Sequence, residues 1–310
     1  MPDPMSDPMP EAETRKPTVI LHAGAPKTGS TSLQHFLYDN ADALRDLGVV
    51  CPERLIGRGQ VDPLHNVLVA LRKGRAEERV LARGRARLEE LFAENGIHTV
   101  IISNESMLGE PFLRDKPGFF PDAKVALPML ERLFEGYRVE VVFFVRDFVS
   151  YIPSYYVQEV RRGLSWSLDR YAAALGDKTL SWKPVVEKLG KSFGADHVRV
   201  FDYDALLASP AETVADAFGS LIPGLPAFGG GDYRKNRSIG GPILGLYRAF
   251  NTLFFRLIPV RYHREGHRKL RRYVFDPLAV FARGGKPMLS AMHANALEDA
   301  FERDRKALGL

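Results

Sequence analysis

The chain has 310 residues, of which 45% are hydrophobic and 26% are charged, and its formal net charge is +5. These proportions lie within the range of a globular protein with a sizeable core. The single cysteine, Cys51, excludes an intramolecular disulfide and a cysteine-based zinc site. The modest basic excess fits phosphorylated or polyanionic ligands without requiring one.

The first 17 residues are rich in proline and acidic residues and contain no apolar run. This composition predicts a disordered tail and neither a signal peptide nor a membrane anchor. We therefore expect a cytoplasmic protein in which residues 18–310 form a single domain. Within that domain, the segment from about residue 240 to about residue 290 is expected to form a helical lid or a region that binds the acceptor substrate.

Short apolar runs alternate with stretches of helical periodicity. Runs rich in β-branched residues and apolar throughout are typical of central parallel strands that are covered on both faces. The sequence therefore predicts an α/β fold, with a central parallel sheet flanked by helices in three layers. The expected strands are residues 18–24, 49–52, 98–103, 139–145 and 197–203. Helices are expected over residues 33–47 and 62–95, with Gly74 and Gly84 breaking the second.

The first predicted strand is followed by the sequence HAGAPKTGSTS, which starts at His22. Gly24 and Gly29 have the spacing of the two glycines in a nucleotide-binding loop, G-x-x-x-x-G-K-[ST]. Ser30, however, stands where that loop has its lysine, and the lysine lies inside the loop as Lys27. Backbone amides at the start of a helix favour an anion, so this loop predicts a phosphate site. An ATP-dependent kinase would be expected to keep lysine at position 30.

Polar residues also follow two other predicted strands, and ligands of parallel sheets bind at the carboxyl ends of the strands. Glu105 comes just after residues 98–103, and Arg146 comes directly after residues 139–145. Ser154 follows Arg146 by eight residues, in what should be the next helix. A guanidinium and a hydroxyl are suited to a second phosphate. On spacing alone, a helix start with a surface arginine explains the pair equally well.

Taken together, PKTGSTS after the first strand and the pair Arg146 and Ser154 resemble the PAPS-dependent sulfotransferases. The resemblance is closest to bacterial carbohydrate-type members, covers roughly residues 18–240 and implies a P-loop NTPase-like fold. It implies 3′-phosphoadenosine-5′-phosphosulfate (PAPS) as co-substrate, PAP as product and no metal. Arg146 is followed by Asp147 and Phe148, where the family usually has a proline, and the family's late Arg-Lys-Gly signature is absent.

The resemblance carries over to individual positions. The loop residues are implied to bind the 5′-phosphosulfate: Pro26, Lys27, Thr28, Gly29, Ser30, Thr31 and Ser32. Arg146 and Ser154 are implied to bind the 3′-phosphate, and Arg237 lies in the counterpart of the late signature.

Sulfuryl transfer builds negative charge on the oxygen that bridges sulfur and phosphorus, and a cation beside it lowers the barrier. Lys27 is the candidate for that role. A general base must take the proton of the acceptor hydroxyl, and Glu105 at a strand end is the first candidate. His65 is the rival base, because other members of the family use a histidine. Glu105 as a helix cap and His65 as a structural residue remain open, and His22 is expected to be a core histidine.

The acceptor is expected to be a hydroxyl of a glycan or glycolipid, with no nucleic acid involved. Residues 240–260 are apolar but interrupted by Arg248 and Arg256, so they do not predict a spanning helix. Residues 261–272 carry six Lys and Arg residues and one glutamate. Such a run predicts a solvated helix face, with peripheral membrane contact or an acidic polysaccharide as alternatives. A kinase using ATP and Mg²⁺, or a non-catalytic protein that binds PAP or a polyanion, are the alternative functions.

Overall fold

The structure is a computed structural model of the whole chain. It describes residues 16–53, 61–74, 78–113, 116, 118–176, 180–229, 241–260, 263–275, 277, 285 and 287–310. Five strands form one parallel sheet in the order β2-β3-β1-β4-β5. These strands are β1 (Thr18–His22), β2 (Val49–Val50), β3 (Thr99–Ser103), β4 (Arg138–Val145) and β5 (Val198–Asp202).

The central strands β1, β3 and β4 are apolar through most of their length because alternate side chains enter two separate cores. Val19 and Leu21 of β1 pack into one hydrophobic cluster, and Ile20 packs into the other. Val142 and Phe144 of β4 likewise face the cluster of Ile20. All five side chains are buried, and burying each contributes roughly 1.5–3 kcal/mol. Burial on both faces is the physical reason for the continuous apolar runs.

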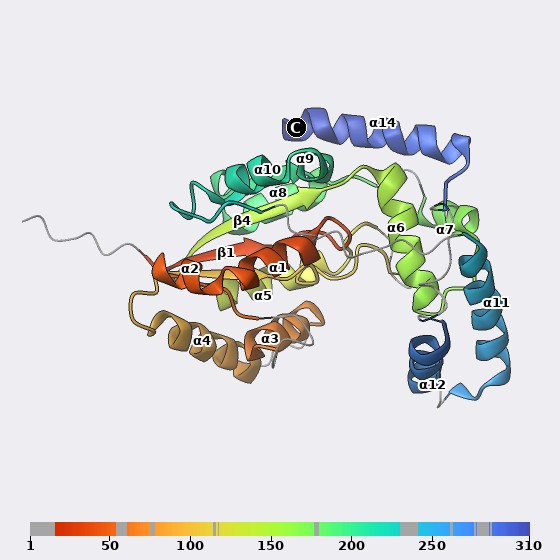
Figure 1. Cartoon of the computed structure of the whole chain (residues 1–310), viewed down its shortest axis with the longest axis horizontal. Coiled ribbons are helices and arrows are strands. Elements are labelled where there is room, and N and C mark those ends of the chain that lie inside the picture. The colour runs from red at the N-terminus through yellow and green to blue at the C-terminus, as the bar shows by residue number, and fades with distance from the viewer. Residues whose placement is uncertain are drawn as a thin grey trace, which may run out of the picture.

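Helices cover both faces of the sheet, as Figure 1 shows. The cluster around Ile20 is closed by α1 (Ser30–Asp39), α2 (Ala41–Asp46), α9 (Tyr203–Ala208) and α10 (Pro210–Phe218). The other cluster is closed by α3 (Pro63–Arg72), α4 (Glu78–Phe92), α5 (Ala123–Leu133), α8 (Lys183–Phe193) and α14 (Ala291–Leu308). A short 3₁₀ helix, η2 (Ala195–His197), precedes β5. The predicted α/β fold, with a central parallel sheet flanked by helices, is confirmed.

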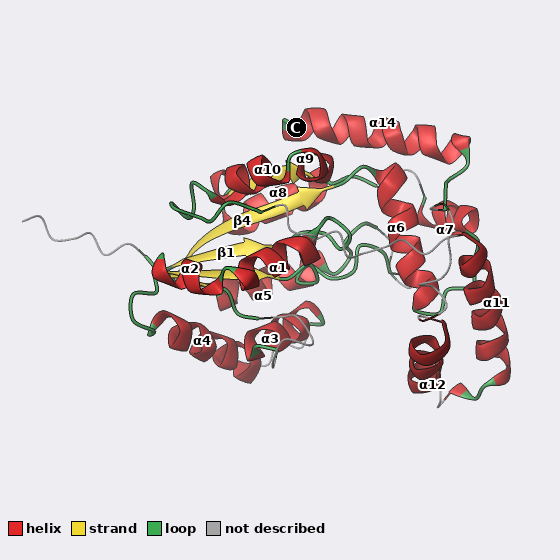
Figure 2. Ribbon diagram, viewed as in Figure 1, coloured by secondary structure: helices red, strands yellow, loops and turns green. Residues whose placement is uncertain are grey.

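The remaining helices gather at one end of the sheet. These are α6 (Phe148–Arg161), α7 (Leu168–Leu175), α11 (Gly241–Leu257) and α12 (His263–Leu270), which continues into the π-helical turn η4 (Arg271–Phe275). Figure 2 shows the strand arrows of β1 and β4 pointing toward α6. The carboxyl ends of the strands therefore face this group of helices, and the candidate site lies between them.

The expected helix break at Gly84 is wrong. The run 62–95 is interrupted around Gly74, but α4 passes through Gly84 without a break. A Cβ on Gly84 would lie 2.6 Å from Leu133 Cδ1 and 2.9 Å from Val67 Cγ1. Glycine at this position therefore permits close packing of α4 on α3 and α5 and does not end the helix.

The single helix expected over residues 33–47 is two helices, and Asn40 separates them. The Asn40 backbone N–H and its side-chain Nδ2 both donate to the Phe36 carbonyl, the latter at 2.8 Å. An asparagine side chain that satisfies a terminal carbonyl competes with helix continuation. The helical content expected within residues 240–290 is present as α11 and α12. In the part of the chain that the structure describes, no helix has the length and apolar composition needed to cross a membrane.

Candidate anion-binding and catalytic site

The loop between β1 and α1 has an unusual backbone conformation. Lys27 has φ of 73° and Gly29 has φ of 83°. A positive φ is uncommon for a residue with a side chain, and such strain is often found at functional sites. The backbone here is held in place from outside the loop, because the Arg146 Nη1 donates a hydrogen bond of 2.7 Å to the Lys27 carbonyl oxygen.

Both glycines of the loop lie where a side chain would not fit. A Cβ on Gly24 would approach His22 Nε2 to 2.9 Å, and one on Gly29 would approach Leu206 Cδ2 to 2.9 Å and a Tyr203 ring carbon to 3.2 Å. The loop is therefore pressed against the end of β1 on one side and against α9 on the other. Its amides are fixed before any ligand arrives.

The loop residues implied to hold a phosphate lie together at the start of α1. Gly29 is the N-cap of this helix, and having no side chain it leaves the first amides to another acceptor. Thr28 Oγ1 donates to the Ala25 carbonyl at 2.6 Å, which closes the loop internally. Pro26, Thr28 and Ser30 are buried, whereas the rest are half-buried: Lys27, Gly29, Thr31 and Ser32. The amides and the helix dipole at this point favour an anion.

Several cations surround the amine of Lys27. Its pKa is lowered, first by burial and then by the guanidinium groups of Arg161, Arg162 and Arg146, while Glu105 acts in the opposite direction. The three guanidinium groups repel the lysine, although Arg162 also pairs with Glu110 and Glu159, each at 3.1 Å. A bound anion would relieve that repulsion, so the electrostatics favour occupancy by a negatively charged group.

Arg146 lies at the end of β4 and is almost completely buried. Besides the Lys27 carbonyl, its guanidinium donates from Nε to Ser150 Oγ at 2.8 Å and stacks 4.7 Å above the Tyr203 ring centroid. The carbonyl of Arg146 accepts a 2.9 Å bond from Trp182 Nε1. Arg146 is thus fixed at both its backbone and its side chain, in contact with the loop between β1 and α1.

Ser154 lies on α6, as the sequence predicts, and is half-buried. Helix α6 begins at the N-cap Asp147, whose Oδ1 accepts from the Ser150 backbone N–H at 2.8 Å. Ser150, Ser154 and Arg161 are spaced by four and seven residues, so they share one face of this helix. That face starts at the partner of Arg146 and ends at a cation that acts on Lys27. The proposed contact of Ser154 with a 3′-phosphate stays a prediction.

Glu105 follows β3, the strand next to β1, and is half-buried. Gln34 of α1 donates from Nε2 to Glu105 Oε2 at 3.1 Å and to the Ser103 carbonyl at 3.2 Å. Gln34 is itself buried, so one amide group ties α1 to the end of β3 and orients the carboxylate. Glu105 and Lys27 act on each other electrostatically, which brings the candidate base and the candidate cation into one site.

His22, at the end of β1, is fully buried. Its Nδ1 lies 2.7 Å from Ser103 Oγ, and its Nε2 has no hydrogen-bond partner among the described residues. The ring also makes edge contacts with Phe144 and Phe218. Burial lowers the pKa of His22 to about 4, although Glu105 opposes the shift. The prediction of a core histidine agrees with this burial, and its neutral ring supports the floor of the loop at Gly24.

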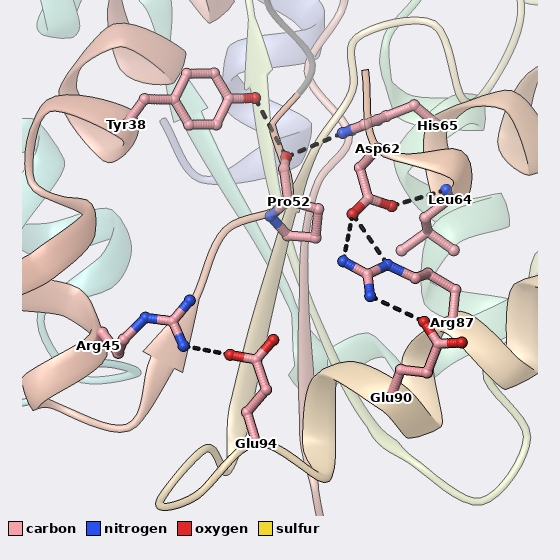
Figure 3. A network of polar contacts seen from close by, with 9 residues as sticks. All are labelled: Tyr38, Arg45, Pro52, Asp62, Leu64, His65, Arg87, Glu90 and Glu94. Carbon is pink, nitrogen blue, oxygen red and sulfur yellow. Dashed lines mark hydrogen bonds and ion pairs between the residues drawn. The ribbon is translucent and has the colours of Figure 1, made fainter. Parts of the chain in front are cut away.

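His65, the alternative base, lies in the network drawn in Figure 3. Its Nε2 is 3.1 Å from the Pro52 carbonyl, which can only accept, so this nitrogen carries the proton. Its Nδ1 lies 3.3 Å from Asn104 Nδ2 and accepts from that amide. Both ring nitrogens are therefore bonded within the protein, and the side chain is only 2% exposed. This environment is that of a structural histidine. Asn104, the residue just before Glu105, links His65 to the end of β3.

The same network holds the start of α3. Asp62 is its N-cap and accepts from the Leu64 backbone N–H at 2.9 Å. Its other oxygen accepts from Arg87 Nε and Nη2 at 3.1 and 2.8 Å, and Arg87 also pairs with Glu90 (Figure 3). The hydrogen bond with Asp62 is the main cause of the raised pKa of Arg87. The network thus joins α3 to α4 and fixes His65.

One candidate residue, Arg237, falls outside the described residues. Sequence reasoning missed three residues of the site. Gln34 bonds to Glu105 from 71 residues away, and Arg161 and Arg162 act on Lys27 from the far end of α6 and its C-cap. The only signal for Arg161 was its helical register with Ser154. Across the described ranges, no group of three or more His, Cys, Asp or Glu residues could hold a metal ion.

Several solved structures are similar to this chain, and three of them are a sulfotransferase and two sulfotransferase domains. No family model and no curated protein match the chain. A sulfotransferase from Alicyclobacillus acidocaldarius aligns with a TM-score of 0.44 and 15% identity over 79% of this chain and 98% of its own. The sulfotransferase domain from the curacin biosynthetic pathway aligns with a TM-score of 0.42 and 14% identity, over 94% and 99% of the two chains. The sulfotransferase domain from the Synechococcus PCC 7002 olefin synthase aligns with a TM-score of 0.33 and 14% identity, over 82% of this chain and 100% of its own. Likeness at this level carries no conclusion about chemistry or substrate, which must come from the residues of the site.

Proposed function

We propose that this protein is a sulfotransferase that moves the sulfuryl group of PAPS to a hydroxyl of a glycan or glycolipid. The observation that carries the proposal is the meeting of Lys27 and Glu105 beside a preformed anion loop. Lys27 is held at a strained backbone position inside the loop, and Glu105 is oriented by Gln34 at the next strand end. One site then offers a cation for a leaving phosphate and a base for an incoming hydroxyl.

The fit of the co-substrate rests on the loop. The amides from Lys27 to Thr31 and the α1 dipole would hold the 5′-phosphosulfate, because Gly24 and Gly29 keep the cradle free of side chains. Arg146 and Ser154 would hold the 3′-phosphate, and for this Arg146 would share its guanidinium with the Lys27 carbonyl and Ser150. PAPS supplies an activated sulfuryl group on a phosphate leaving group.

The residues then divide the chemistry of an in-line displacement. Glu105 removes the proton of the acceptor hydroxyl while the acceptor oxygen forms a bond to sulfur. The bond between sulfur and the bridging oxygen breaks, and Lys27 stabilises the charge left on that oxygen. Burial, and after it the guanidinium groups of Arg161 and Arg162, lower the pKa of Lys27, which eases donation of a proton to the leaving group. His65 remains the alternative base, although its two bonded nitrogens favour Glu105.

Nucleotide-dependent thermal unfolding tests the proposal, since a ligand stabilises the fold according to its affinity, by about 2.7 kcal/mol at a hundredfold excess over Kd. We expect PAP and PAPS to raise Tm and ATP with Mg²⁺ to raise it far less. Larger stabilisation by ATP with Mg²⁺ would indicate the kinase alternative instead. The charge-matched pair Lys27→Ala and Lys188→Ala separates the loop from general electrostatics, because Lys188 is an exposed lysine on α8.

Turnover separates an enzyme from a binding protein. Labelled PAPS is incubated with acceptor pools that contain glycans and glycolipids, and transfer of the label is followed. We expect transfer that Glu105→Gln abolishes while PAP still raises Tm. Stabilisation by PAP without transfer to any hydroxyl acceptor would support the non-catalytic alternative.

A further inference from the structure

The helical hairpin of α11 and α12 has an exposed apolar face that the proposed chemistry does not use. Along α11, the buried positions are Leu244, Tyr247, Asn251 and Phe254, which recur with helical spacing. The opposite face carries Leu246, Leu253 and Leu257, which are 51%, 59% and 65% exposed. Solvent faces of helices are normally polar, so an aliphatic stripe there indicates a binding surface.

The stripe continues into the turn after α11. Ile258 is 36% exposed and Val260 is 81% exposed. We call Leu253, Leu257, Ile258 and Val260 the hairpin tip. Figure 1 shows that the end of α11 and α12 lie together at the outer end of the molecule, away from the sheet. The tip is therefore placed where a large flat partner can reach it.

The hairpin is firmly attached to the body of the protein. Asn251 Nδ2 donates to the carbonyls of Val160 and Leu164 at 2.7 and 2.8 Å, at the end of α6. His267 Nε2 donates to Asn251 Oδ1 at 2.8 Å, and its ring lies 5.2 Å from the ring of Phe255. These buried polar bonds fix α11 and α12 to each other and to α6. The tip is consequently presented by a rigid support.

Positive charge accompanies the tip. Residues 241–275 contain eight Lys and Arg residues and one acidic residue, Glu265. The solvent face of α12 and η4 exposes Arg268, Lys269 and Arg272, and Arg256 lies within the apolar stripe. Aliphatic side chains beside clustered cations are typical of a segment that lies in the interface of an anionic membrane.

The charge also argues against a second copy as the partner. Two hairpins packed face to face would bring the exposed cations of each copy, Arg256, Arg268, Lys269 and Arg272, against the same set on the other copy. Nucleic acid would neutralise the cations but would leave the leucines and Val260 in water. We propose that the hairpin tip docks on an anionic phospholipid surface. The aliphatic side chains enter the headgroup boundary, and Arg256, Arg268, Lys269 and Arg272 contact lipid phosphates.

Vesicle flotation of the full chain tests this inference, which does not depend on the proposed sulfuryl transfer. The probes are vesicles of phosphatidylcholine alone and of phosphatidylcholine mixed with phosphatidylglycerol. We expect binding to the mixed vesicles that weakens with added salt. Leu257→Glu/Val260→Glu and Arg268→Glu/Lys269→Glu should each weaken it about tenfold or more. Light scattering and thermal unfolding of the same variants report the oligomeric state and the fold.

Matched controls separate docking from net charge and general apolarity. Lys188→Glu/Lys191→Glu on α8 changes the charge by the same amount as the α12 variant, and Leu207→Glu replaces a leucine on α9 that is 45% exposed. Both should bind within about twofold of the unaltered protein. Equal binding to both vesicle types, or equal losses in the α8 and α12 variants, would overturn the proposal. A dimer that Leu257→Glu/Val260→Glu dissociates, without vesicle binding, would assign the tip to a second copy.

Discussion

Two regions meet just after β3: the loop between β1 and α1 together with Glu105, and the polar network around His65. They are joined by the consecutive residues Asn104 and Glu105. Asn104 bonds to His65 on α3, and Glu105 bonds to Gln34 on α1. The His65 network is closed, with both ring nitrogens and the carboxylate of Asp62 bonded within the protein. The loop region instead concentrates cations and first-turn amides whose complement would be an anion.

The difference shows why residue type alone does not identify a catalytic group. A histidine is the commonest general base, but a base must be able to reach its substrate and keep an acceptor position for the proton. His65 fails on both counts unless its network opens. Glu105 is half-buried and is oriented through one oxygen by Gln34. Four predictions test this contrast.

The largest expected effect is that of Glu105→Gln, which keeps the size of the side chain but cannot accept a proton. Turnover should fall about 10²–10⁴-fold, while PAP affinity changes little. His65→Asn is the comparison variant and should lower stability with a much smaller change in turnover. Rates measured for both variants with the same acceptor decide between them. If His65→Asn abolishes turnover and Glu105→Gln does not, the histidine is the base.

Lys27→Ala should lower turnover about 10²–10³-fold, because it removes the cation beside the leaving oxygen. PAP binding should suffer less, since PAP lacks the bridging oxygen and the loop amides remain. Single-turnover rates at saturating PAPS and calorimetric PAP affinities separate the two effects. Near-normal turnover in this variant would remove Lys27 from the mechanism.

Arg146→Ala should weaken PAP about tenfold or more, because a charge-assisted hydrogen bond contributes roughly 1.5–3 kcal/mol. Adenosine 5′-phosphosulfate, which has no 3′-phosphate, measures the part of the loss that comes from the released Lys27 carbonyl. Ser154→Ala should weaken PAP and leave adenosine 5′-phosphosulfate unaffected, because Ser154 is not bonded to the loop in the way Arg146 is. Calorimetry with equal losses for both nucleotides in Ser154→Ala would contradict the 3′-phosphate clamp.

The last prediction concerns stability rather than activity, and it follows from His22 and pH. Its pKa is lowered from 6.5 to about 4 in the folded protein, so the unfolded chain binds a proton first as pH falls. The stability that its neutral form contributes is present above pH 6.5 and is lost toward pH 4. Between pH 7 and pH 5, protonation of His22 in the unfolded chain should lower the free energy of unfolding by about 2 kcal/mol. Urea unfolding should show that His22→Gln loses less stability over this range than the unaltered protein, and parallel losses would contradict the assignment.

Much of the fold follows from local sequence. All five strands were predicted, and the apolar runs of β1, β3 and β4 were the strongest signal because burial on both faces requires apolar residues at successive positions. The sequence around Lys27 predicted the loop before α1, because glycines and a helix start constrain the backbone within a few residues, and anion binding by its amides stays a prediction. The strand-end rule then placed Glu105 and Arg146 at the same edge of the sheet.

Tertiary structure decided which groups meet. Gln34 and Glu105 are 71 residues apart, and Lys27 and Arg146 are 119 apart, so no local pattern reports their bonds. The sequence suggested a helix break at Gly84 because the residues that need a glycine there, Leu133 and Val67, come from two other helices and are not visible in the local pattern. His65 looked like a possible base until Pro52 and Asn104 were found on its two nitrogens. Sequence determines backbone preference and burial over short range, whereas the partners of a polar side chain depend on the order of strands and the packing of helices between them.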